Sequence, residues 1–235
     1  MKFITALIFT IFSVSNGLAA EGTANSLSDA EKSAGWRLLF DGQDASAHWR
    51  GFKKDGLPAE WVVEEGALVR RGGGDIITKE KFDSFELTID WKISERGNSG
   101  IIFKVIEEGR RPHFTGPEAQ ILDNPKSKEA QKAGWLYQLY PASVDATKPA
   151  GEWNTFLLKC RKNATGNYLC EHWLNGTKYV EYEIGSKEWK ERVSKSKFAG
   201  LGDFATAEAG HIALQDHGNV VSFRNIKIRP LLPLK

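Results

Sequence analysis

The sequence predicts an all-β protein, a single sandwich of two antiparallel sheets with one short helix. Apolar and polar residues alternate along most of the chain, which is typical of strands buried on one face. Turn signals separate these runs at short intervals, and too few helical segments are present to cover a parallel sheet. With 235 residues, of which 41% are hydrophobic, the chain is long enough to bury one substantial core.

The N-terminal stretch, MKFITALIFTIFSVSNGLAA, has the pattern of a secretory signal peptide. A lysine precedes an apolar run that is too short to span a bilayer, and small residues follow it. We therefore expect residues 1–20 to be removed on export to the periplasm or the extracellular space, leaving no membrane association. Residues 21–34 are polar and lack an apolar period, so they are predicted to be a flexible linker before a folded domain at 35–235.

Strands and hairpins account for most of the domain. In the clearest strand, FELTIDWKI at residues 85–93, every second side chain is apolar. Hairpins are predicted to turn at Glu65-Gly66 and at Asn175-Gly176. Further strands are expected near residues 36–40, 75–78, 100–106, 117–122, 135–140, 153–160, 210–214 and 220–229.

A single short helix is predicted at residues 186–198, SKEWKERVSKSKF. Ser186 is a suitable N-cap, and charged residues surround Trp189 and Val193. One helix of this length cannot cover the apolar face of a sheet, so the two sheets are expected to pack their apolar faces against each other.

The charge of the chain excludes one class of partner. Lys and Arg total 32 against 30 for Asp and Glu, a formal net charge of +2. Without a basic field to attract phosphates, nucleic acid is not expected to bind.

Both cysteines flank one predicted turn, NATGN. Counting outward from this turn places Cys160 opposite Cys170, so they form either a cross-strand disulfide or a pair of free buried thiols. Neither has a histidine upstream at a catalytic spacing, and a thiol nucleophile is not supported.

Three polar clusters interrupt the apolar runs. GNSGIIF (97–103) places Asn98 between two glycines at the start of a strand, where it is either a plain turn or a point of close ligand approach. In GPEAQILDN (116–124), Glu118 and Gln120 point to one side of a strand and form either a binding face or an ordinary solvated one.

The third cluster is QDHGNVVSF at residues 215–223. Here Gln215, Asp216 and His217 occupy a turn between two apolar strands. His217 is either a turn residue held by Asp216 or part of a site.

Aromatic residues favour a sugar as the ligand. Sugar rings stack their CH faces on aromatic rings while their hydroxyls bind amide and carboxylate groups. In a sandwich of this size, the concave face of a curved sheet is where such a ligand is expected. The aromatic candidates, some of which belong to the core, are Trp61, Trp91, Trp135, Tyr137, Tyr140, Trp153 and Trp173.

From about Gly35 to Leu231 the chain resembles the 3-keto-disaccharide hydrolase family. The motifs that carry the resemblance, in order, are GNSGIIF, GPEAQILDN, GWLYQLY, KPAGEWNTFLL, EHWLNGTKYVEYEI and GHIALQDHGNVVSF. It implies a concanavalin A-like jelly roll related to glycoside hydrolases. The sequence departs from the family at Gln138, where an Asp is usual, and in having the cysteine pair.

The resemblance implies cleavage of a sugar whose 3-hydroxyl a separate upstream 3-dehydrogenase has already oxidised. A ketone at carbon 3 acidifies the proton on carbon 2, so a general base can remove it. The enolate then expels the group on carbon 1, and water adds to the resulting glycal. Such a site needs a base, a donor to the ketone oxygen and an acid for the leaving oxygen.

The polar clusters contain the residue types that this chemistry needs. The base is His217 or Glu118, and the two remain equal candidates. Asn98 and Gln120 are candidate donors to the enolate oxygen or to sugar hydroxyls. The remaining substrate-binding candidates are Asp123 and Asp216 as orienting groups, Arg224 as a balancing charge and Tyr137 as a sugar contact.

No motif in the sequence requires a cofactor. Glu118, Gln120 and His217 would nevertheless be a suitable donor set for a divalent cation that acts as a Lewis acid.

Two other classes of function are consistent with the same fold. A carbohydrate-binding module would use the aromatic and polar groups without catalysis. A conventional glycoside hydrolase needs two carboxylates that flank the bond, and the sequence shows no close carboxylate pair beside Glu118.

Overall fold

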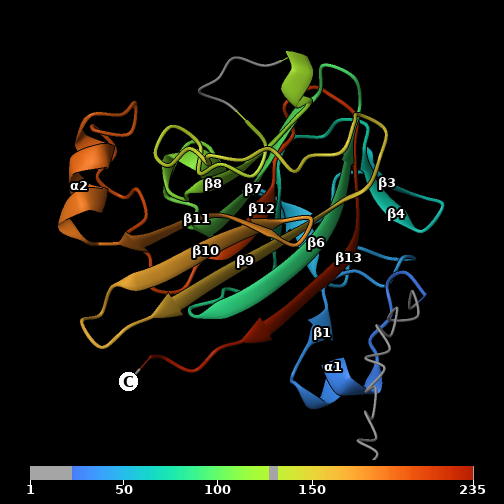
Figure 1. The fold of residues 1–235 in the computed structure, drawn as a ribbon. Helices are drawn as coiled ribbons and strands as arrows, with labels where there is room; N and C mark the ends of the chain where they lie inside the picture. Colours follow the sequence, from blue (N-terminus) through green and yellow to red (C-terminus); the bar gives the residue numbers. More distant parts are fainter. Residues whose placement is uncertain (1–22, 127–131, 235) are drawn as a thin grey trace, which may run out of the picture.

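The computed structural model describes residues 23–126 and 132–234, and it is a sandwich of two antiparallel sheets. The expected signal peptide at residues 1–20 lies outside the described residues. Figure 1 shows β9, β6 and β13 of the larger sheet in front of β7, β8 and β12 of the smaller one. The predicted fold class is therefore confirmed, including the jelly-roll arrangement.

The larger sheet has eight strands in the order β11-β10-β9-β6-β13-β4-β3, with β1 paired to β13. Its long strands are those whose alternation is clearest in the sequence. The bounds are β1 (Arg37–Leu38), β3 (Trp61–Glu64), β4 (Ala67–Arg70), β6 (Phe85–Ile93), β9 (Asn154–Lys162), β10 (Tyr168–Leu174), β11 (Thr177–Ile184) and β13 (Val221–Pro230).

The smaller sheet has five strands in the order β2-β5-β12-β7-β8. Its members are β2 (Trp49–Gly51), β5 (Ile76–Thr78), β7 (Asn98–Val105), β8 (Glu118–Leu122) and β12 (His211–Leu214). All three polar clusters lie on this sheet or next to it. Residues 97–103 form the start of β7, residues 116–124 contain β8, and residues 215–217 follow β12.

The core lies between the sheets and is formed by the alternating apolar side chains. Phe85, Leu87, Ile89 and Trp91 of β6 are all at most 1% exposed. The other face of β6 is covered as well, because Glu86 bonds Arg229 and is 5% exposed. Burial on one face alone, which alternation predicts, thus understates the burial of this central strand.

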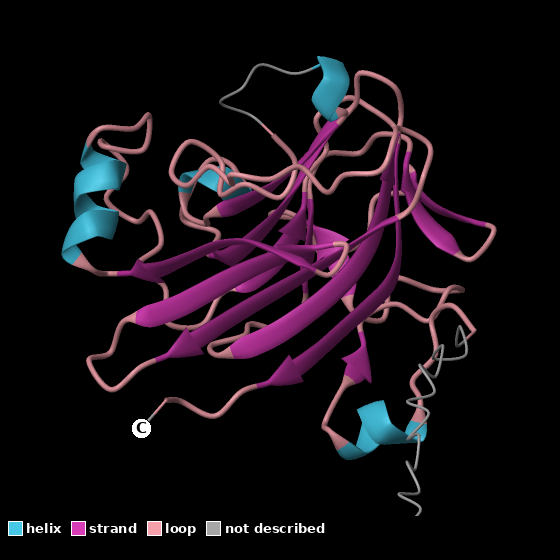
Figure 2. Cartoon of the chain, viewed as in Figure 1, coloured by secondary structure: helices cyan, strands magenta, loops and turns pink. Residues whose placement is uncertain are grey.

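The helices lie at the periphery, as Figure 2 shows. α2 (Lys187–Ser194) is shorter than predicted and begins as expected, because the Ser186 hydroxyl accepts a hydrogen bond from the backbone N–H of Trp189. Two single turns of 3-10 helix, η1 (Pro112–Phe114) and η2 (Asn124–Lys126), flank β8.

The linker predicted at residues 21–34 needs a correction over its described part. Residues Asp29–Ser33 form helix α1, which a capping box between Ser28 and Glu31 begins. The backbone N–H of Asn25 also donates to Asn225 Oδ1 over 2.6 Å, which ties the segment to β13. The sequence contains the Ser and Glu of this capping box, but the segment has no apolar stripe, and for that reason it was not predicted to be a helix.

One predicted strand is absent from the structure, and one strand of the structure was not predicted. Residues 135–140 form a turn with only isolated bridges at Leu136, and no strand. Strand β2 (Trp49–Gly51) was not predicted, because Trp49 is the only large apolar residue in it and no apolar run marks it.

The cysteines face each other across β9 and β10, as the turn predicts. Cys160 pairs with Cys170 in the register, and both are free, fully buried thiols with their sulfurs 2.9 Å apart. Of the two alternatives left open, the structure has the thiol pair.

Within the described residues, no helix is long and apolar enough to cross a membrane.

Candidate active site

The candidate site lies on the outer face of the five-stranded sheet. In the register of β7 and β8, Gly100 is opposite Gln120 and Ile102 is opposite Glu118. Because Ala119 faces the main core, Glu118 and Gln120 point to the other side of the sheet. The side-chain alternation predicted for β8 is therefore present.

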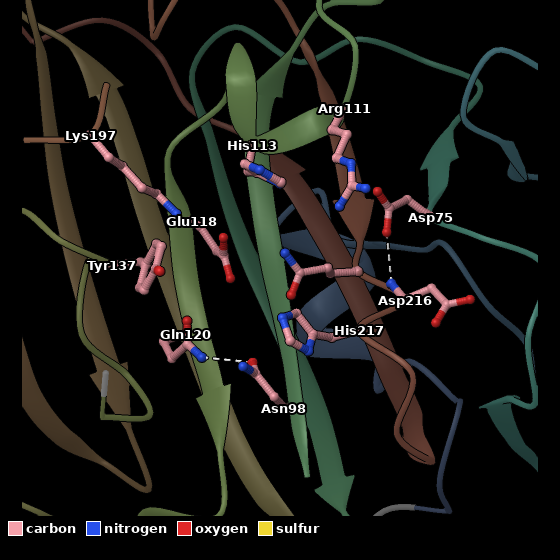
Figure 3. A pocket seen from close by; sticks show the side chains of 11 residues that line it. Asp75, Asn98, Arg111, His113, Glu118, Gln120, Tyr137, Lys197, Asp216 and His217 are labelled. Atoms are coloured by element: carbon pink, nitrogen blue, oxygen red, sulfur yellow. Dashed lines mark hydrogen bonds between the residues drawn. The ribbon is translucent and has the colours of Figure 1, made fainter. Parts of the chain in front are cut away.

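These side chains open into a cavity of about 320 Å³. Figure 3 shows them converging on the cavity, and they come from β7, β8, the turn after β12, η1 and the loops that bear Asp75, Arg111, Tyr137 and Lys197. The lining residues are Asp75, Asn98, Arg111, His113, Glu118, Gln120, Tyr137, Lys197, Gln215, Asp216 and His217.

Glu118 is the most perturbed acid of the cavity. It is 5% exposed, and burial raises the pKa of its carboxyl to about 8, although the Lys197 ammonium opposes the shift. The charge of Asp75 raises the pKa of Glu118 further, while a hydrogen bond from Gln215 lowers it. At neutral pH, Glu118 is therefore mostly protonated and able to give a proton.

Gly100 leaves the space that the Glu118 side chain occupies. A Cβ on Gly100 would lie 2.5 Å from Glu118 Oε1, which is closer than any side chain tolerates. The glycine in GNSGIIF is therefore required by the close approach of this carboxyl across the strand pair.

Asn98 and Gln120 form one amide unit at the floor of the cavity. Gln120 Nε2 donates to Asn98 Oδ1 over 2.8 Å, which leaves the Asn98 amide nitrogen available as a donor (Figure 3). The Asn98 backbone N–H donates to Asn219 Oδ1, which fixes the start of β7 to the loop before β13.

The turn after β12 is tied to both sides of the cavity. Ser99 Oγ donates to the Gln215 carbonyl over 2.8 Å, and the Gln215 N–H donates to the Gly100 carbonyl. Arg70 and Asp216 form an ion pair at 2.6 Å, with side chains only 13% and 9% exposed. The turn thereby presents the His217 imidazole to the cavity (Figure 3).

Asp75 and Asp216 share the wall next to His217. The Asp216 N–H donates to Asp75 Oδ1 over 2.7 Å, and burial raises the pKa of Asp75. Burial also acts on Asp216, but hydrogen bonds from Arg70 and two backbone N–H groups outweigh it and lower its pKa. Asp75 is thus a third carboxyl group in the cavity, beside Glu118 and Asp216, and the sequence did not suggest it.

The opposite wall carries a neutral imidazole and an ammonium group. Burial, together with the charges of Lys197 and Arg111, lowers the pKa of His113 to about 4, so the ring is uncharged at neutral pH. The Lys197 ammonium lies 4.0 Å from the centre of the Tyr137 ring. His113 Nδ1 and Gln215 Oε1 are buried without a hydrogen-bond partner in the described structure, as expected of walls built for a polar ligand.

Most of the residues expected from the sequence meet in this cavity. Glu118, Gln120, Asn98, Tyr137, Asp216 and His217 all line it. Two do not. Asp123 instead accepts a hydrogen bond from the Arg96 N–H and holds the turn before β7, and Arg224 lies on β13 with Asp90 and the Trp153 ring.

The aromatic candidates also divide, and Tyr137 alone of them lines the cavity. Trp61, Trp91 and Tyr140 are core residues, and Trp135 packs against the core. Gln138, the departure from the family pattern, is exposed and does not line the cavity.

Sequence reasoning missed Asp75, Arg111, His113 and Lys197. Three of them lie on loops and His113 lies in the single 3-10 turn η1, and in such segments no period reveals which way a side chain points. The three glycines before Asp75 were the one available signal.

Among the described residues, no group of three or more His, Cys, Asp or Glu side chains is arranged to hold a metal ion. Glu118, Gln120 and His217, the donor set named from the sequence, do line the same cavity, together with charged side chains of both signs.

The polar cavity on the jelly-roll sandwich holds groups suited to acid and base chemistry, and the similarities that follow identify the chain as a carbohydrate-active hydrolase. The chain belongs to the family described as the 3-keto-alpha-glucoside-1,2-lyase-like domain, whose model matches residues 35–229. It is 31% identical over 234 residues to a 3-keto-disaccharide hydrolase of Bacteroides thetaiotaomicron, covering 84% of this chain and 79% of that protein.

Two solved structures from Parabacteroides distasonis, both described as candidate glycosyl hydrolases, are similar to this fold. One is 33% identical with a TM-score of 0.80, covering 88% of this chain and 99% of that one. The other is 29% identical with a TM-score of 0.61 and covers 84% of each chain.

Proposed function

We propose that this protein cleaves the glycosidic bond of 3-keto-glycosides by elimination, followed by addition of water. The observation that carries the proposal is the pairing of a protonated acid, Glu118, with an imidazole, His217, in one polar cavity. The family and the relative from Bacteroides thetaiotaomicron point to the same substrate class.

In the proposed first step, His217 takes the proton from carbon 2 of the bound 3-keto sugar. The electrons of the C2–H bond form the enolate, whose charge on the carbon 3 oxygen needs donors. Lys197 and the Asn98 amide nitrogen are two donors of that kind in the cavity.

In the second step, the enolate electrons form the C1=C2 double bond while the C1–O bond breaks. Glu118 gives its proton to the leaving oxygen, because its raised pKa keeps it protonated at neutral pH. Water then adds to the glycal: its oxygen bonds carbon 1 as Glu118 takes back a proton from it, and His217 returns a proton to carbon 2. The sum of the steps is hydrolysis.

A conventional glycoside hydrolase is the second candidate, and Asp75 is the observation that favours it. Asp75 and Glu118 place two carboxyl groups in one cavity, which is the equipment of a retaining or inverting mechanism. That mechanism acts on the unoxidised glycoside, so the substrate separates the two candidates.

The test compares a 3-keto-glucoside with its unoxidised parent, using the wild-type chain and the variants Glu118→Gln and His217→Ala. We expect turnover of the keto substrate alone, and a loss of about 10²-fold or more in kcat in each variant. Turnover of the parent glucoside would favour the conventional mechanism. Binding of sugar without turnover of either would favour the binding module, and a chelator arm tests a divalent cation as the electrophile.

The proposed substrate also implies a setting for the protein. A 3-keto sugar is supplied by oxidation of the 3-hydroxyl, so we propose a separate 3-dehydrogenase upstream. We further propose export to the periplasm or beyond the cell, from the apolar N-terminal stretch.

A further inference from the structure

A second cavity, of about 380 Å³, adjoins the first. The two share Asp75, Arg111 and Asp216 as a common wall. A glycoside whose keto ring fills the first cavity therefore has space beyond this wall for the group on carbon 1. The remaining walls of the second cavity are Phe52, Lys54, Arg110 and the glycines at 73 and 74.

The second cavity has more positive than negative charge. Its cations are Lys54, Arg110 and Arg111, and its acids are Asp75 and Asp216. Asp216 is already neutralised by its ion pair with Arg70 at 2.6 Å. The three cations thus face one carboxyl group without an ion pair, that of Asp75. Asp75 accepts a hydrogen bond from the Asp216 N–H.

Arg110 and Arg111 have no carboxylate within ion-pair distance in the described part of the chain. The nearby acid Glu107 is occupied, because it accepts hydrogen bonds from the Arg50 guanidinium and the Lys53 N–H. Both arginines are exposed, so their charges are available to a ligand in the cavity.

The loop that bears the arginines is held in place by Thr115. Its hydroxyl donates to the Ile106 carbonyl over 3.0 Å and accepts from the Ile106 N–H, which closes the loop on itself. The Phe114 N–H also donates to the Arg111 carbonyl over 3.0 Å. The braced backbone fixes the position from which the two arginine side chains extend, and their guanidinium groups can then meet a planar anion in the cavity.

We propose that the second cavity binds the leaving group of the glycoside and that Arg110 and Arg111 select leaving groups that carry a carboxylate. The planar guanidinium fork matches a carboxylate, and Phe52 offers an apolar surface for the ring that bears it. The substrate class is then 3-keto-glycosides of acidic sugars or of aromatic acids. This inference rests on the proposed function.

The test uses substrate pairs that differ in charge and little in shape. One pair is the 3-keto-glucosides of 4-hydroxybenzoate and 4-hydroxybenzamide, and the other is 3-keto-glucosyl glucuronic acid and 3-keto-glucosyl glucose. For each pair, the measured quantity is the ratio of kcat/KM for the acid to kcat/KM for the neutral partner. The pairs together separate an aromatic acid from a sugar acid as the preferred leaving group.

We expect the ratio to fall about tenfold in Arg110→Gln, to fall by less in Arg110→Lys, which keeps the charge but lacks the planar fork, and to fall with added salt. Arg96→Gln is the matched control, because Arg96 is exposed and lines neither cavity. Equal ratios in wild type and Arg110→Gln, with both partners turned over, would overturn the inference and leave the proposed function standing. If no keto substrate is turned over, both are wrong.

Discussion

Replacing Glu118 with Gln should make the protein more stable at neutral pH, by an amount that depends on pH. Burial raises the pKa of Glu118 from its ordinary 4.5 to about 8. The native state therefore holds a proton that the unfolded chain releases above pH 4.5, and the stability of the wild type falls as pH rises from 4.5 to 8. Gln keeps the shape of the side chain and cannot ionise.

The size of the effect follows from the two pKa values. At about 1.36 kcal/mol per pKa unit, the wild type loses about 3 kcal/mol relative to Glu118→Gln between pH 4 and 7, and about 5 kcal/mol by pH 9. Groups that titrate in both proteins cancel in this difference. A further rise in pH leaves the difference constant, because Glu118 is then ionised in both states.

The assay is urea unfolding of both proteins at a series of pH values from 4 to 9. Glu95→Gln, at an exposed glutamate, is the control for the loss of one carboxyl group. A pH-independent difference between wild type and Glu118→Gln would show that Glu118 is not held as a neutral acid, and its role as a proton donor would be lost with it.

Three further predictions follow from single features of the structure. Turnover of the 3-keto substrate should decline above about pH 8, as Glu118 loses its proton, and a flat pH–rate profile through pH 9 would contradict this. Gly100→Ala should lower kcat about 10²-fold, because the new Cβ displaces the Glu118 carboxyl, whereas Gly56→Ala, with open space around it, should be neutral. Cys160 and Cys170 should resist a thiol reagent in the native protein and both react after unfolding in the absence of reductant; labelling of neither would indicate a disulfide.

Local patterns predicted the parts of the fold that depend on neighbours in the sequence. The alternation in β8 gave the shared face of Glu118 and Gln120, and the turn between β9 and β10 gave the register that pairs Cys160 with Cys170. These features are short-range, because a strand has a fixed period and a tight turn fixes the pairing beside it.

Other parts of the site depend on long-range packing that no local pattern records. Lys197 reaches the cavity from the segment after α2, and His113 reaches it from a single 3-10 turn. Arg224 shows the opposite error, because it was predicted to lie in the site and does not line the cavity. It follows His217 closely in sequence, but the chain crosses from one sheet to the other between them, so Arg224 lies on β13 of the eight-stranded sheet and pairs with Asp90 of β6.

The most direct test of the proposed elimination is the fate of the hydrogen on carbon 2 during turnover. A 3-keto-glucoside labelled with deuterium at carbon 2 would be cleaved in ordinary water, beside an enzyme-free sample that measures spontaneous exchange. Elimination predicts loss of the label from the released 3-keto sugar, well above the spontaneous rate, and slower turnover than for the unlabelled substrate. Product that keeps its deuterium, formed as fast as from the unlabelled substrate, would show that the bond to hydrogen at carbon 2 is not broken and would contradict the proposed mechanism.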